Sequence, residues 1–159
     1  DLRSAVSLID DAETVYVVGF RRSLPVSSYL AYSLQQLNKR TVFVDGVGGL
    51  TRQQIQSIGP GDLLIDVSFH PYADETIQAV QMAITHQAQV LSISDSLVSP
   101  TAKPATLALQ VKEAEIRKFR SLVATMCLVQ AIVISYAFVV SEAEARAPRK
   151  PPAKRRRAS

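Results

Sequence analysis

Two groups of residues in this chain could bind an anion, and each follows a short apolar run. Arg21, Arg22 and Ser23 come directly after the first such run. Ser68 and His70 come at the end of the third. A guanidinium group can bind phosphate or carboxylate through two hydrogen bonds, and hydroxyl and imidazole groups add further bonds. These residue types predict a binding site for a negatively charged small molecule.

Three more residues belong to the predicted site. Gly19 forms the turn before the arginines, Ser94 ends the fourth apolar run, and Glu75 follows the loop of His70. Glu75 and His70 are the one couple that could serve as general base and acid, although an acidic residue also suits the first turn of a helix. The sequence therefore favours ligand binding over catalysis.

Other chemistries lack the residues that they require. A dinucleotide-binding turn, with Asp45 as its ribose-binding acid, would need glycines where Arg21 and Leu24 stand. A single cysteine, Cys127, excludes an intramolecular disulfide, and two histidines leave no cluster with metal-ligand spacing. We therefore expect neither a cofactor nor a metal.

Five short runs that are apolar at consecutive positions predict strands buried on both faces of a parallel sheet. They span residues 14–19, 41–44, 62–68, 89–94 and 106–111. Helical patterns alternate with them, at residues 25–37, 50–57, 73–86 and 116–140. Ser23 is the expected cap of the first of these helices. The alternation predicts a three-layer, flavodoxin-like α/β sandwich with a five-stranded parallel sheet.

The predicted fold places its ligand crevice independently of the residue chemistry. In such a sheet the crevice opens where the strand order reverses, outside the carboxyl ends of the first and third strands. The loops at these two ends are residues 20–24 and 69–74, which carry most of the candidate anion-binding side chains. Topology and chemistry therefore indicate the same site.

The positive charge of the chain is concentrated at its end. The 159 residues carry a formal net charge of +4, yet residues 141–159 alone contain seven basic and two acidic residues. We expect residues 1–140 to form one domain and residues 141–159 a disordered, Pro-rich tail that binds DNA or an acidic partner, or keeps the chain soluble. The near-neutral body lacks the basic surface of a nucleic-acid-binding domain. The first residue is Asp1 instead of Met, and no signal-peptide pattern follows, so we expect a cytoplasmic chain that is a fragment of a longer protein.

The stretch 121–140 contains no charged residue and has two possible interpretations. Twenty such residues could span a bilayer. The stretch also contains Gln130 and several hydroxyl groups, and a helix that is apolar all round can be buried between a sheet and a partner subunit. We expect no membrane segment here, but a homodimer or tetramer formed through the helix 116–140.

The order and spacing of these motifs resemble those of sugar isomerase (SIS) domains. Residues 19–23 resemble the GxGxS turn of that family, residues 62–68 its DxxxxxS strand, and residues 91–100 its iTd…SPla segment. Glu113 or Glu115 resembles the acid before its last helix. The most similar variant is the effector domain of RpiR/MurR-type bacterial transcriptional regulators. The resemblance implies a phosphosugar or related anionic effector, and DNA binding by a helix-turn-helix domain upstream of this chain.

Several positions depart from the family pattern. Arg21 replaces the second glycine of the turn, and His70, Pro71 and Ala73 replace a serine, a glycine and a threonine of the phosphate loop. Proline removes a backbone donor, while the basic side chains add positive charge, so we expect a changed but still anionic ligand. Two alternatives stay open, an aldose–ketose sugar-phosphate isomerase and a dimerisation module without a ligand.

Overall fold

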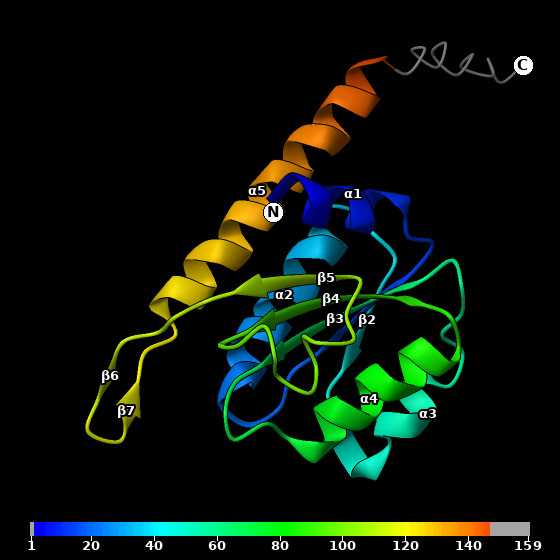
Figure 1. The fold of residues 1–159 in the computed structure, drawn as a ribbon. Helices are drawn as coiled ribbons and strands as arrows, with labels where there is room; N and C mark the ends of the chain where they lie inside the picture. The colour runs from blue at the N-terminus through cyan, green and yellow to red at the C-terminus, as the bar shows by residue number, and fades with distance from the viewer. Residues whose placement is uncertain (1, 147–159) are drawn as a thin grey trace, which may run out of the picture.

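A computed structural model describes residues 2–146 of the chain. These residues form a five-stranded sheet covered by helices, followed by a β-hairpin and a long helix (Figure 1). The sheet has the order β2-β1-β3-β4-β5, and all its pairings are parallel. The predicted flavodoxin-like α/β sandwich is confirmed. Most of the predicted basic tail lies outside the described residues.

All five predicted strands are present close to their expected bounds. They are β1 (Val15–Val18), β2 (Thr41–Val44), β3 (Leu63–Ser68), β4 (Gln89–Ser94) and β5 (Leu107–Gln110). The central strand β3 is buried along its whole length. Because both of its faces are covered, its sequence is apolar at consecutive positions instead of alternating.

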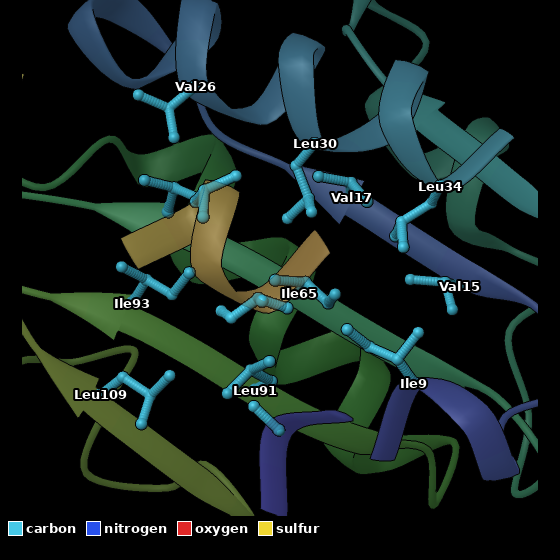
Figure 2. Packing of buried hydrophobic residues seen from close by; sticks show 14 of the residues in the cluster. Ile9, Val15, Val17, Val26, Leu30, Leu34, Ile65, Leu91, Ile93 and Leu109 are labelled. Carbon is cyan, nitrogen blue, oxygen red and sulfur yellow. The ribbon is translucent and has the colours of Figure 1, made fainter. Parts of the chain in front are cut away.

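The helices form two layers, each with its own hydrophobic cluster. Their bounds are α1 (Leu2–Asp11), α2 (Leu24–Gln36), α3 (Thr51–Ile55), α4 (Asp74–Thr85) and α5 (Val123–Arg146). On one face of the sheet, Val17 and Ile65 pack with residues of α1, α2 and α5 (Figure 2). On the other face, Val18 and Leu64 pack with residues of α3 and α4. Successive strand residues point to opposite faces, so one apolar run supplies both clusters.

Helix α1 is absent from the sequence prediction. It places Ala5, Val6 and Ile9 on the sheet side, where all three are buried. Leu2, Ala5, Val6 and Ile9 follow the i, i+3, i+4, i+7 spacing of a helix with one apolar face. The sequence therefore carries the pattern of this helix, and the prediction overlooked it.

The predicted helix 116–140 is wrong at both ends. Residues 115–120 form a hairpin of strands β6 (Glu115–Ile116) and β7 (Phe119–Arg120), and α5 begins only at Val123. Glu113 caps α5, because its carboxylate accepts a hydrogen bond of 2.7 Å from the Thr125 amide. At the other end α5 continues to Arg146, which pairs with Glu142 one turn earlier at 3.6 Å.

Ser23 does not cap α2 as predicted. Residues Arg21–Ser23 already form a 3₁₀ turn, and Ser23 has helical backbone angles instead of the extended ones typical of a cap. The hydroxyl of Ser27 bonds instead to the carbonyl of Gly19 at 3.1 Å. The start of α2 thus has no side-chain cap, and the Ser27 hydroxyl links the helix to the turn after β1.

Helix α5 is partly buried and partly exposed. Thr125, Val129, Ile132 and Tyr136 face the core, and Ile134 and Phe138 are 57% and 67% exposed. By length and composition it is the one helix within residues 2–146 that could cross a membrane, a test that the core helix of a soluble protein also passes. The exposed apolar side chains show that this chain alone does not bury the whole helix.

Candidate anion-binding site

A cavity of about 250 Å³ opens where the strand order reverses between β1 and β3. Its wall is formed by the loop after β1, by the end of β3 with the loop that follows it, and by β7. The lining residues are Phe20, Arg21, Arg22, Ser23, Val67, Ser68, Phe69, His70, Pro71, Ala73, Thr76 and Arg120. The cavity therefore occupies the crevice expected from the topology.

The structure brings five of the eight predicted site residues together in this cavity. These are Arg21, Arg22, Ser23, Ser68 and His70. Gly19 lies behind the cavity, where a Cβ atom would come within 3.0 Å of the Val67 carbonyl oxygen, so glycine permits the close packing of this turn on β3. Ser94 is buried, with its Oγ 3.0 Å from Ser99 Oγ, and Glu75 is exposed in the first turn of α4.

Arg22 is the most unusual side chain of the cavity. Its guanidinium carbon lies 4.6 Å from the centre of the Phe69 ring, a cation–π contact. Within residues 2–146, its buried Nη1 atom has no hydrogen-bond partner. Burial lowers the pKa of Arg22, and the charge of Arg120 lowers it further, against the opposite effect of nearby carboxylates such as Asp95. A buried donor without a partner is unfavourable, and an anion in the cavity would supply one.

Arg120 is a site residue that the sequence prediction missed. It lines the cavity from β7 and donates a hydrogen bond to the carbonyl oxygen of His70. Its Nε also pairs with Glu115 at 3.1 Å. No local pattern points to Arg120, because it lies 50 residues from His70 and inside a stretch that looks helical. Of the two acids matched to the family, Glu113 caps α5 and Glu115 holds Arg120, and neither lines the cavity.

Thr76 is a second lining residue that the sequence prediction missed. Its side chain is 1% exposed, and within the described part of the chain its Oγ1 has no hydrogen-bond partner. Its amide donates to the carbonyl of Ala73 at 3.0 Å, in the first turn of α4. The cavity thus has two buried polar atoms without partners, one on Arg22 and one on Thr76.

A fully buried acid, Asp66, lies behind Ser68. Its Oδ2 accepts hydrogen bonds from Ser68 at 3.0 Å and from Ser92 at 3.1 Å. Thr101 connects these hydroxyls, 2.7 Å from Ser68 Oγ and 3.2 Å from Ser92 Oγ. Burial raises the pKa of Asp66 to about 7, although the hydrogen bonds from Ser92, Ser68 and Thr101 act to lower it. Ser68 therefore belongs both to the cavity wall and to an internal polar network.

The loop after β3 is fixed by Asp95. One carboxylate oxygen accepts the His70 amide at 3.1 Å, and the other accepts the Tyr72 hydroxyl at 2.8 Å. The His70 and Tyr72 rings meet edge to face, with centroids 5.9 Å apart. Because the His70 amide is bonded to Asp95 and Pro71 has no amide hydrogen, these two positions offer no free backbone donor to a phosphate.

The geometry is suited to binding more than to proton transfer. The predicted acid–base couple is not brought together at the cavity, since His70 lines it and Glu75 does not. Among residues 2–146, no group of three or more His, Cys, Asp or Glu side chains could hold a metal ion. The cavity is instead lined by Arg21, Arg22 and Arg120. Their guanidinium groups can bind an anion in place of the backbone amides, of which the loop after β3 offers few.

The fold and the cavity define a doubly wound α/β domain with a basic pocket at its switch point. The sequence matches the model of the SIS domain over residues 8–135, and the chain therefore belongs to the SIS domain family. No curated protein matches the chain.

Several solved structures share the fold. The sugar isomerase domain of an RpiR transcription factor from Sphaerobacter thermophilus is 27% identical with a TM-score of 0.79, over 92% of this chain and 86% of that one. The NanR protein of Vibrio vulnificus, complexed with ManNAc-6P, is 24% identical with a TM-score of 0.75, over 91% of this chain and 56% of that one. The E. coli CFT073 protein c3406, in complex with A5P, is 17% identical with a TM-score of 0.67, over 91% and 78%.

Proposed function

We propose that this chain is the ligand-sensing domain of an RpiR-type bacterial transcriptional regulator in the cytoplasm. Its ligand is a phosphosugar or a related anionic metabolite. The observation that carries this proposal is the buried Nη1 of the half-buried Arg22, which lacks a partner within residues 2–146 and points to a cavity that Arg120 also lines. An anion bound there would supply the missing hydrogen bonds and offset the repulsion between the two arginines.

The comparisons support the same class of ligand. The NanR protein was solved with ManNAc-6P and the E. coli protein with A5P, both in structures that share this fold. The cavity of this chain adds aromatic side chains, Phe20 and Phe69, to its basic ones. A sugar phosphate has both a charged group for the arginines and ring or chain carbons for these apolar surfaces.

Calorimetric titration tests this proposal. We expect ManNAc-6P, A5P or another member of a panel of sugar phosphates and acidic sugars to bind, and the parent neutral sugars not to bind. Arg22→Ala should weaken binding about ten- to a hundredfold, because a hydrogen bond to a charged group contributes roughly 1.5–3 kcal/mol. Arg52→Ala, an exposed arginine on α3, is the matched control. If no anion binds at millimolar concentration, the ligand-free dimerisation module is the better account.

An isomerase is the second candidate, and the position of His70 in the cavity is the observation that favours it. Isomerisation requires a group that moves a proton between neighbouring substrate carbons. Incubating the chain with A5P and other aldose or ketose phosphates in deuterated water, followed by NMR, would detect both interconversion and exchange of the substrate proton. We expect neither, because Glu75 does not accompany His70 at the cavity. Turnover that His70→Gln abolishes would overturn this expectation.

We propose in addition that two copies associate through α5. Its exposed side chains include Val123, Ile134 and Phe138, at 69%, 57% and 67% exposure, and exposed apolar side chains along one helix favour a partner. Ile134→Glu or Phe138→Glu should yield monomers in analytical ultracentrifugation, without unfolding. Ile132→Glu is expected to unfold the chain instead, because Ile132 is completely buried. A wild-type chain that is monomeric at micromolar concentration would contradict the proposal, and recovery only in detergent would favour the membrane alternative.

DNA binding is expected from a helix-turn-helix domain upstream of this chain. The test requires the protein that includes that segment, with operator binding measured with and without the sugar phosphate. An anion that binds the cavity and leaves operator affinity unchanged would remove the regulatory part of the proposal.

A further inference from the structure

The hairpin β6–β7 has little contact with the rest of the molecule. Each of its strands has two residues, and the hairpin projects from the sheet at the start of α5 (Figure 1). Ile116 and Phe119 are 73% and 75% exposed, so its apolar side chains pack on nothing within the described residues. A two-stranded hairpin of this length is at best marginally stable by itself. Its position therefore depends on a few specific contacts.

One of these contacts lies at the cavity. Arg120 lines the cavity, donates to the His70 carbonyl and is paired with Glu115 on the facing strand. Within residues 2–146, this is the one place where a side chain of residues 115–120 bonds to the sheet domain. The contact that docks the hairpin is thus also part of the cavity wall.

In the absence of an anion, this docking is opposed by charge. Arg120 and Arg22 line the same cavity, and Arg22 keeps a buried nitrogen without a partner among residues 2–146. The charge of Arg120 acts to lower the pKa of Arg22, against the opposite effect of Asp95, Glu113 and Glu115. Two guanidinium groups at one cavity repel each other, and a bound anion converts this repulsion into attraction from both sides. The anion therefore stabilises the docked hairpin as well as its own complex.

The base of the hairpin is joined to α5 by two hydrogen bonds. The Ser121 amide donates to the Ala114 carbonyl at 2.9 Å, which closes the base, and Glu113 accepts the Thr125 amide in the first turn of α5 at 2.7 Å. Docking or release of residues 115–120 consequently acts on the beginning of the helix whose exposed face we assign to the dimer.

We infer that Arg120 is a ligand-binding residue, and that the bound anion docks the hairpin 115–120 against the cavity and so fixes the start of α5. This inference rests on the proposed anion site and extends it to a residue outside the motifs of the family. Arg22, from the loop after β1, and Arg120, from β7, then bind one anion in the cavity that both line.

Calorimetry with ManNAc-6P, A5P and inorganic phosphate tests the role of Arg120. Arg120→Ala should weaken binding about ten- to a hundredfold. Arg120→Lys should recover part of the loss, because lysine keeps the charge without the forked geometry. Lys118→Ala removes the same charge from the exposed turn of the same hairpin and should leave binding unchanged. The inference is overturned if Arg22→Ala binds the anion weakly while Arg120→Ala binds it as tightly as the wild type does. That result would leave the proposed function intact.

Hydrogen–deuterium exchange measures the docking itself. The amides of residues 113–125 should exchange more slowly when the wild-type chain is saturated with the best-binding probe of the three. In Arg120→Ala, saturated with the same probe at a correspondingly higher concentration, this protection should be lost, while protection of the loop after β1 remains. If Arg120 has a purely structural role, the amides of residues 113–125 should exchange fast in Arg120→Ala, both with and without the probe. In the wild-type chain, the probe should then give these amides no protection. Unchanged exchange in the wild type therefore overturns the inference.

Discussion

The side-chain donors on the rim of the cavity and those in the network behind it differ in whether they have partners inside the fold. The rim consists of Arg21, Arg22, His70 and Arg120, and what we call the floor is the buried network around Asp66, of which Ser68 lines the cavity. On the rim, like charges face one cavity and a buried Arg22 nitrogen has no partner among the described residues. On the floor, each serine or threonine hydroxyl bonds to another side chain of the network, and only the Oδ1 of Asp66 has no partner among the described residues.

The presence or absence of a partner inside the fold therefore distinguishes the residues that can bind a ligand from those that stabilise the fold. Donors that have partners inside the fold stabilise it and are not available to a ligand, whereas donors that lack partners weaken the fold slightly and are available. We therefore expect substitutions on the rim to change ligand affinity with little effect on unfolding. Substitutions on the floor should change the free energy of unfolding first.

The largest expected effect concerns Asp66. Its pKa is raised from 3.8 to about 7 in the folded chain. An acid whose pKa is higher in the folded state binds more protons there, so its contribution to the free energy of unfolding falls as the pH rises from about 4 to about 7. Over this range the wild type should lose about 4 kcal/mol relative to Asp66→Asn, which does not titrate.

Urea unfolding of both proteins between pH 4 and pH 8 measures this difference. Asp74→Asn, which removes an exposed acid from α4, is the control and should follow the wild type. Parallel profiles for the wild type and Asp66→Asn would show that the floor does not hold a protonated acid.

A smaller effect of the opposite sign is expected at Thr76. Its hydroxyl is buried without a partner in the described part of the chain, so Thr76→Val removes an unsatisfied polar atom and keeps the shape of the side chain. The free energy of unfolding should rise by roughly 1 kcal/mol, while affinity for the sugar phosphate falls. Thr85→Val, on the same helix, removes a hydroxyl that does bond, to the Gln81 carbonyl at 2.9 Å, and should not stabilise the fold. Loss of stability in Thr76→Val would place its hydroxyl in the floor network.

The smallest effect is expected at Ser68, which belongs to both regions. Ser68→Ala removes the hydrogen bonds of its hydroxyl with Asp66 and Thr101, and one hydroxyl oxygen from the cavity wall. Both unfolding free energy and ligand affinity should fall by about 1 kcal/mol, which calorimetric titration and urea unfolding measure in the same preparation. Ser28→Ala, exposed on α2, should change neither. A loss in affinity as large as that of Arg22→Ala would mean that the floor, too, binds the ligand directly.

The sequence predicts the sheet well because its strands are buried on both faces. Runs such as β3 stay apolar at consecutive positions, and the helices between them, α2 and α4, show the period of a helix with one buried face. The hairpin carries no comparable pattern, because Ile116 and Phe119 are both exposed and resemble the apolar start of α5. Burial creates a periodic pattern, and an exposed element has none.

The same reasoning explains which part of the site was predictable. Arg21, Arg22, Ser68 and His70 follow strand ends, and parallel strands bring their carboxyl ends to one edge. Arg120 reaches the cavity from the hairpin, and Asp66 gains its environment from Ser92 and Thr101, so both depend on contacts between distant segments. Such contacts follow from the packed fold and not from any local spacing of residues.

The most direct test of the account is Arg22→Ala, followed by calorimetry and urea unfolding on one preparation. The account predicts a ten- to hundredfold loss of affinity for the sugar phosphate and a change of at most about 0.5 kcal/mol in unfolding free energy. Arg52→Ala should change neither quantity. Affinity that is unchanged in Arg22→Ala, or a stability loss that accounts for the weaker binding, would contradict the claim that the rim is reserved for an anion.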